Sequence, residues 1–336
     1  MEYILGVDGG NTKTDYFLFN VNGEAISFLR GATCSHEGLK DSFEGSYRVL
    51  NEVLIPFLKK HNLNPADLKA SVFGLAGVDT PKQKEKLEEV ISRLGFINFR
   101  VINDSFLGIK AGTPNGVGVC SINGTGTSSG GIDILGNTLQ VGGIGAIVGD
   151  EAGGSYIARQ VIRACFDEAY RFGEATSLTP IVMKYLDVTK KEELMEKISE
   201  VITTKKLDLT HLTIACFDEA SKNDKVAINI LTKMADNLAR SAGGVVNNMQ
   251  FTEPVQIVMA GSVWVKGNCP EMISEFSRKI QEYTKKKCQF NLLKVPPATG
   301  AIIWALELVK GTFPSVAMRE KIIQEVSKEL ELQNNN

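Results

Sequence analysis

The chain has 336 residues, with 37 Lys and Arg against 39 Asp and Glu, and 43% of it is hydrophobic. This length exceeds one comfortable hydrophobic core, so we expect two domains of about 100 to 200 residues each. The balanced charge lacks the basic footprint of a nucleic-acid-binding protein, and no apolar run of the sequence is long enough to span a bilayer.

The chain opens with a predicted β-hairpin, in which a strand from Tyr3 and a return strand over 16–19 flank a polar tip. Gly9 and Gly10 lack Cβ atoms, so backbone N–H groups at the tip, with the hydroxyls of Thr12 and Thr14, could bind phosphate oxygens. Asp8 adds a carboxylate oxygen, a ligand that Mg²⁺ accepts. The same residue types also collect in ordinary turns. Because the first strand begins within three residues of Met1, we expect no signal peptide.

The loop at 31–38 carries Thr33, Ser35 and His36 between glycines, which makes it a candidate ligand loop. The alternative for His36 is a surface histidine beside a helix. Helical periodicity follows over 41–61, and a short strand covers 70–75. The next helix begins at Thr80 as cap, with Pro81 in the first position and Gln83 completing a capping box.

A strand over 99–102 leads into Asn103 and Asp104, just before a helix that continues to about Ala111. Open α/β sheets bind ligands at the carboxyl ends of their strands, which favours a functional role for Asp104. An Asp at a helix start can also simply cap the helix. We place a domain boundary in the loop that follows, so that the first predicted domain covers 1–115.

The second half begins with a similar hairpin, in which a strand over 117–122 runs into Asn-Gly-Thr-Gly-Thr at 123–127 and returns. Two phosphate-type turns, each opening one half of the chain, predict two similar domains that face each other across a cleft. The second predicted domain covers 116–336 and includes a helical insertion at about 155–245.

Glycine-rich segments mark two further positions in the second half. The segment 142–154 contains Gly149, Asp150 and Glu151, and its many glycines indicate close backbone approach. An acid pair before a helix is also favoured by the helix dipole. A buried strand over 254–259 then ends at Gly261 and Ser262, and helices are predicted over 271–286 and 316–331.

Taken in order over residues 3–305, the motifs at 7–14, 101–104, 123–127 and 259–262 resemble those of the actin-like ATPase superfamily of sugar kinases. Within it, the chain most resembles the N-acetylglucosamine kinase and BadF/BadG/BcrA/BcrD-type ATPase family. The resemblance implies an α/β fold of two ribonuclease H-like domains with a nucleotide cleft between them. It further implies ATP and Mg²⁺ as cofactors and a kinase that makes the 6-phosphate of N-acetylglucosamine, with N-acetylmuramate or glucosamine as variants.

The resemblance also implies roles for individual residues. Asp104 would accept the proton of the sugar hydroxyl, and Asp8 would hold Mg²⁺ through water. The implied nucleotide contacts are Gly9, Gly10, Asn11, Thr12, Lys13, Gly124, Thr125, Gly126 and Thr127, with Gly261 and Ser262 beside the nucleoside. The implied sugar contacts are Ser35, His36, Asn103, Gly149, Asp150 and Glu151. The loop at 31–38 departs from the family pattern because it has no Asn, which leaves the identity of the sugar open.

Two other functions fit the same resemblance. The first is an ATPase that activates a radical dehydratase and bridges an iron-sulfur cluster between subunits through paired cysteines. Cys120 and Cys165 do not sit in the glycine-rich helix starts that this needs. The second is a sugar-sensing regulator, which would need a DNA-binding domain. The six widely spaced cysteines indicate reduced thiols, so we expect a cytoplasmic protein. We also expect a homodimer that binds a small-molecule sugar rather than nucleic acid or membrane.

Overall fold

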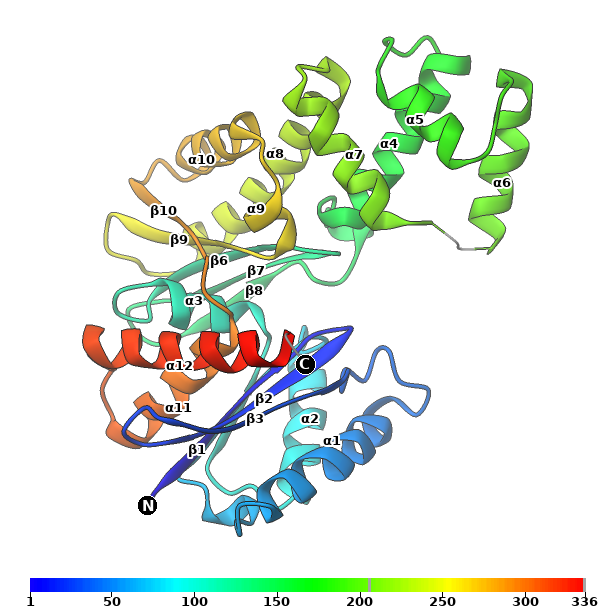
Figure 1. Cartoon of the computed structure of the whole chain (residues 1–336). Helices are drawn as coiled ribbons and strands as arrows, with labels where there is room; N and C mark the ends of the chain where they lie inside the picture. Colours follow the sequence, from blue (N-terminus) through cyan, green and yellow to red (C-terminus); the bar gives the residue numbers. More distant parts are fainter. Residues whose placement is uncertain (205–206, 335–336) are drawn as a thin grey trace.

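The computed structural model describes residues 1–204 and 207–334, and two five-stranded sheets dominate it (Figure 1). The first sheet has the order β3-β2-β1-β4-β5 and the second has the matching order β8-β7-β6-β9-β10. In each sheet the first three strands form an antiparallel meander, and the last two add in parallel. The α/β class and the repeat predicted from the two polar turns are therefore confirmed.

The strands of the two sheets have the following bounds. The first sheet contains β1 (Tyr3–Gly9), β2 (Lys13–Asn20), β3 (Ala25–Ala32), β4 (Ala70–Leu75) and β5 (Phe99–Ile102). The second contains β6 (Gly118–Asn123), β7 (Thr127–Ile132), β8 (Thr138–Val141), β9 (Val255–Ala260) and β10 (Cys288–Leu292). Three short 3₁₀ turns also occur, η1 (Pro65–Asp67), η2 (Ala146–Val148) and η3 (Lys191–Glu193).

The first sheet is covered on both faces, which explains why its strands β1 and β2 are buried along most of their length. One face packs Leu5, Val7 and Leu18 against α1 (Ser42–Lys59) and α2 (Pro81–Arg93). At the start of α2 the predicted cap is present, since the Thr80 hydroxyl accepts the N–H of Gln83 at 3.3 Å.

The space between the sheets is filled by α3 (Ser105–Gly112) and α11 (Ala298–Lys310), which pack against each other. The approach is close, because a Cβ on Gly300 would lie 2.0 Å from the carbonyl oxygen of Leu107. Helix α11 lies on β1 and β4, and α12 (Val316–Asn334) lies on α11 and β3, so the end of the chain returns to the first sheet (Figure 1). The domain boundary at 115–116, which falls between β5 and β6, stays a prediction.

Among the described residues, five helices occupy the range of the predicted insertion and lie on the outer side of the second sheet, and their status as an insertion stays a prediction. They are α4 (Gly153–Tyr170), α5 (Leu178–Tyr185), α6 (Leu194–Thr204), α7 (Leu209–Ser221) and α8 (Lys225–Asn248). Helix α8 lies on β6 and β7 and packs against α10 (Pro270–Thr284), while the short α9 (Ser262–Lys266) follows β9. Residues 205–206 of the predicted insertion and 335–336 of the second predicted domain lie outside the described residues. None of the helices in the described ranges has the length and apolarity needed to cross a membrane.

Candidate active site

The two polar tips open into one cavity of about 290 Å³. The tip between β1 and β2 contributes Asn11 and Thr12, and the tip between β6 and β7 contributes residues 124–128. Asn103 and Asp104, from the end of β5, lie in the same wall. The remaining lining residues are Glu37, Ala76, Gly77, Asp79, Ile122 and Gly143. Segments far apart in the sequence therefore converge on one cleft, as two facing hairpins require.

At the first tip, a backbone hydrogen bond of 2.9 Å from Gly10 to the carbonyl of Lys13 closes the turn. A Cβ on Gly9 would lie 2.7 Å from Leu75, so packing explains this glycine, whereas Gly10 is less crowded. The prediction that Thr14 faces phosphate is wrong, because β2 begins at Lys13 and the buried Thr14 hydroxyl accepts the N–H of Cys34. Lys13 forms an ion pair of 3.1 Å with Asp15 and is not among the residues that line the cavity.

The second tip has the features of a phosphate cradle. A Cβ on Gly124 or Gly126 would meet no atom within 4 Å, so protein packing does not account for these glycines, and the space in front of them is open. The start of α4 anchors the tip from behind, since Gly154 donates to the carbonyl of Gly124 at 2.8 Å and Ser155 donates to that of Thr125 at 3.1 Å. Thr127 donates its hydroxyl to the Ile122 carbonyl at 2.9 Å. Exposed N–H groups on a rigid loop are suited to bind an anion.

Asp104 stands at the start of α3 but does not cap it. Its side chain makes no capping hydrogen bond, and the side-chain oxygen of Asn103 accepts the Ser105 N–H at 3.0 Å instead. The alternative of a simple cap is therefore wrong, and the Asp104 carboxylate remains available to the cleft. Burial, followed by the negative charge of Asp79, raises the pKa of Asp104 to about 6. A carboxylate of this basicity is suited to accept a proton near neutral pH.

Asp8 and Asp104 interact electrostatically, which bears on a metal site. Burial, followed by the charges of Asp104 and Asp15, raises the pKa of Asp8 to about 7. The positive charge of Lys13 lowers the pKa of Asp8 but does not outweigh these effects, and Asp8 lies behind the residues that line the cavity. Mg²⁺ would supply further positive charge beside the two carboxylates. No three His, Cys, Asp or Glu side chains converge as ligands within residues 1–204 and 207–334. Mg²⁺ needs no such cluster, because it is usually held by one or two carboxylates, water and substrate phosphates, so these residues fit the ion.

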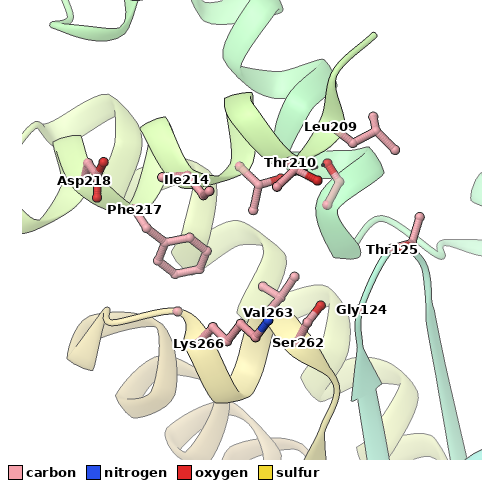
Figure 2. Close-up of a pocket in the computed structure, with 13 residues that line it drawn as sticks. Gly124, Thr125, Leu209, Thr210, Ile214, Phe217, Asp218, Ser262, Val263 and Lys266 are labelled. Atoms are coloured by element: carbon pink, nitrogen blue, oxygen red, sulfur yellow. Dashed lines mark hydrogen bonds between the residues drawn. The ribbon is translucent and has the colours of Figure 1, made fainter. Parts of the chain in front are cut away.

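A second cavity of about 390 Å³ adjoins the second tip, and Gly124 and Thr125 border both cavities. It lies between α7 and α9, and Figure 2 shows the ring of Phe217 pointing across it toward α9. Ser262 lines this cavity as predicted for the nucleoside side, together with Val263 and Lys266. An apolar slot beside a phosphate cradle is suited to hold a nucleobase.

Gly261 has a structural explanation. Its φ is 103°, and a Cβ there would lie 2.5 Å from the carbonyl oxygen of Asn123. The turn after β9 thus needs glycine to bring two strand ends together.

The predicted sugar residues lie around the cleft without all lining it. Ser35 donates its hydroxyl to the Ala76 carbonyl at 3.3 Å. His36 is buried and stacks on Phe43 with ring centroids 4.2 Å apart, so the expectation of a surface histidine is wrong. Burial lowers the pKa of His36. In this loop the residue that reaches the cavity is Glu37.

The segment 149–151 supports the cleft from outside. The Asp150 carboxylate accepts the N–H groups of Gly143, Ile144 and Gly145 at 2.7 to 2.9 Å, and so shapes the loop that brings Gly143 to the cavity. Glu151 forms an ion pair of 2.9 Å with Arg159. The Cβ position of Gly149 faces open space, and none of these three residues is among those that line the cavity. Their contact with sugar stays a prediction.

Several lining residues were not predicted from the sequence. Asp79 and Glu37 line the cavity between the two tips, and Phe217 and Lys266 line the second cavity. Asp79 had a detectable signal in the sequence, because it follows a glycine-rich segment at the end of a strand and directly precedes the helix cap Thr80. Phe217 lies on an ordinary amphipathic helix, so nothing local marks it.

The cysteines give no support to an iron-sulfur protein. Cys120 and Cys165 are buried, and burial raises the pKa of both thiols. A cluster shared between subunits needs thiolates at the surface. Of the other four cysteines only Cys288 is half-buried rather than fully buried.

Comparisons with known proteins agree with this geometry. The chain is 28% identical over 307 residues to the N-acetylmuramic acid/N-acetylglucosamine kinase of Clostridium acetobutylicum, covering 91% of this chain and 98% of that protein. It is 25% identical over 321 residues to the N-acetyl-D-glucosamine kinase of Dictyostelium discoideum, covering 92% and 99%.

Among solved structures, a provisionally named N-acetylglucosamine kinase of Chromobacterium violaceum matches with a TM-score of 0.65 and 17% identity, over 92% of this chain and 99% of that one. A ROK-family glucokinase of Streptomyces griseus, in complex with glucose and AMPPNP, matches with a TM-score of 0.51 and 17% identity, over 92% and 99%. These likenesses show the two-domain fold of actin-like ATPase sugar kinases. The match to the family described as the BadF/BadG/BcrA/BcrD ATPase family extends over residues 5–305, and the chain belongs to that family.

Proposed function

We propose that the protein is an ATP-dependent kinase of N-acetylated amino sugars that makes the 6-phosphate of N-acetylglucosamine. The observation that carries the proposal is the convergence of Asp104 and both polar tips on one cavity, next to a second cavity suited to a nucleobase. The names of the two relatives at 25% and 28% identity support an amino sugar as the acceptor.

The residues divide the work of phosphoryl transfer between the two sides of the cleft. Phe217, Val263 and Ser262 would hold the nucleoside. The backbone N–H groups of Thr125 and Gly126 would bind the phosphates, since the Gly124 N–H donates to the Gly126 carbonyl within the tip. Asp104 would take the proton of the sugar hydroxyl as its oxygen attacks the γ-phosphorus and the bond to ADP breaks, a role worth roughly 10² to 10⁴ in rate. Mg²⁺, when bound near Asp8, would neutralise charge on the phosphate oxygens. Closure of the cleft on the sugar would exclude water and limit ATP hydrolysis.

A coupled ADP-release assay with N-acetylglucosamine, N-acetylmuramate, glucosamine and glucose tests the activity, and phosphorus NMR of the product identifies the phosphorylated hydroxyl. We expect N-acetylglucosamine to give the highest kcat/KM and a 6-phosphate. Asp104→Asn should bind ATP with nearly the wild-type Kd and lose turnover. A protein that turns over none of these sugars would refute the proposed activity, and an Asp104→Asn variant with normal turnover would refute the role of Asp104.

Four further parts of the proposal have tests of their own. The Mg²⁺ requirement rests on the neighbouring Asp8 and Asp104 carboxylates, and chelation should abolish turnover. A cytoplasmic location rests on the reduced, mostly buried thiols, and cell fractionation tests it. The mass of the protein in solution tests the homodimer. Limited proteolysis tests the domain boundary at 115–116.

A further inference from the structure

One carboxylate oxygen bonds both sides of the cleft. Oδ1 of Asp79, which follows β4 of the first sheet, accepts the side-chain N–H of Asn103 at 3.0 Å. The same oxygen accepts the side-chain N–H of Gln140, on β8 of the second sheet, at 2.5 Å. The proposed mechanism gives Asp79 no task, although it lines the cavity between the two tips.

The neighbours of Asp79 hold it in this position. Its backbone N–H donates to the side-chain oxygen of Gln83 at 3.1 Å, which ties it to the start of α2. On the opposite side, Gln140 also donates to the carbonyl of Gly142 at 3.2 Å. Gly143 has a φ of 92°, and a Cβ there would lie 2.8 Å from both Asp79 Oδ1 and Gln140 Nε2. A side chain at position 143 would therefore push the two partners apart.

The bond to Asn103 reaches the proposed base through the start of α3. A carboxylate can only accept hydrogen bonds, so Asp79 fixes the Asn103 amide with its nitrogen toward Asp79 and its oxygen toward the Ser105 N–H. The Asn103 side chain thereby accepts the first N–H of α3, and the side chain of Asp104, the N-cap residue, makes no capping hydrogen bond. The charge of Asp79 also contributes to the raised pKa of Asp104.

We infer that Asp79 is a positioning residue that links the two sides of the cleft, because it holds the second sheet through Gln140 and the residue before the base through Asn103. The inference rests on the proposed function for its effect on catalysis, but the link itself does not depend on it. A hydrogen bond to a charged group is worth on the order of ten- to a hundredfold in an equilibrium constant. Loss of this link should therefore shift the ligand-free protein toward an open cleft.

A double-mutant cycle with Asp79→Ala and Gln140→Ala tests the inference. Gln140→Ala should raise the sugar KM by about tenfold and leave the ATP KM unchanged, since one charged hydrogen bond is lost on the sugar side. Asp79→Ala should in addition lower kcat, because Asn103 and Asp104 lose their support. The double variant should be no worse than Asp79→Ala alone. The matched control is Gln256→Ala on β9, a glutamine whose side chain bonds Gln289 at the surface and not the cleft.

Small-angle X-ray scattering of the ligand-free variants supplies a readout without activity. Gln140→Ala should show a larger radius of gyration than the wild type, and Gln256→Ala should not. If Asp79→Ala does not fold, Asp79→Val, which fills more of the volume and has no acceptor oxygen, takes its place in the cycle. The inference would be overturned if the double variant showed the product of the two single-variant losses in kcat/KM for the sugar. An unchanged radius of gyration in Gln140→Ala would also overturn it. A wild type that phosphorylates no sugar would refute the proposed function, and the scattering comparison would still decide the link.

Discussion

Asp104→Asn should make the ligand-free protein more stable at pH 8 while it abolishes turnover. The pKa of Asp104 is raised from 3.8 to about 6, so the folded protein binds this proton more tightly than the unfolded chain does. The stability that protonation provides is complete below pH 3.8 and is lost as the pH rises to 6. At about 1.36 kcal/mol per pH unit, the rise of the pKa from 3.8 to about 6 corresponds to a loss of about 3 kcal/mol. This value is an upper limit, because Asp104 is half-buried and solvent screens part of its charge.

Thermal unfolding of the ligand-free wild type and variant from pH 4 to pH 8 measures this effect. Asn cannot ionise, so the two proteins should have similar stabilities at pH 4, and the variant should gain several degrees in Tm by pH 8. The control is Asp133→Asn: burial would raise the pKa of Asp133, but hydrogen bonds from Asn137 and the Leu135 N–H lower it. That variant should lose stability at pH 8. An Asp104→Asn protein that is as stable as the wild type at pH 8, or less stable, would refute the conclusion that burial and Asp79 raise the pKa of Asp104.

Gly126→Ala should keep the wild-type Tm but raise the ATP KM, because its Cβ would enter the open space of the second tip. Gly261→Ala should instead lower the free energy of unfolding by about 1–3 kcal/mol, because the φ of Gly261 is 103°. Thermal unfolding and ATP titration of both variants separate these effects, and equal effects would contradict a phosphate site at the second tip. Phe217→Ala should weaken ADP binding by about tenfold in calorimetry and leave the sugar KM unchanged, whereas a change confined to the sugar would reassign that cavity. Asp8→Asn should raise the Mg²⁺ concentration for half-maximal turnover, and an unchanged Mg²⁺ titration would remove Asp8 from the metal site.

The sequence was sufficient for features that depend on neighbours along the chain. Both hairpin tips, the cap at Thr80 and the helices of the predicted insertion follow from local patterns of glycine, proline and apolar spacing. The Thr14 error is also local, because the strand begins three residues earlier than the apolar run, and this turns the hydroxyl inward. In the sheet Thr14 pairs with Gly9 of β1 and with Gly31 of β3, and only the first of these pairings belongs to the hairpin.

Features that depend on the meeting of distant segments could not be predicted. Asp79 follows β4 of the first sheet, and Gln140, 61 residues later, lies on β8 of the second, so neither residue carries a local sign of their bond. For the same reason the sequence left open whether Asp104 caps α3 or faces the cleft. Either side chain could cap α3, and Asp79 decides between them by accepting the Asn103 amide.

The repeated fold carries different chemistry at its two equivalent tips. Asp8 and Asn123 both lie where a central strand meets its glycine-containing tip, but only Asp8 carries a charge. Asn123 is buried, and its side-chain oxygen accepts the Gly153 N–H at 2.9 Å, which fixes α4 behind the cradle without adding negative charge near phosphate. The acids Asp8, Asp79 and Asp104 thus belong to the first-sheet side, and uncharged N–H donors belong to the second. This division suits phosphoryl transfer, because the base must lie at the acceptor hydroxyl, Mg²⁺ must reach the phosphate oxygens, and the nucleotide must be held by groups that attract those oxygens.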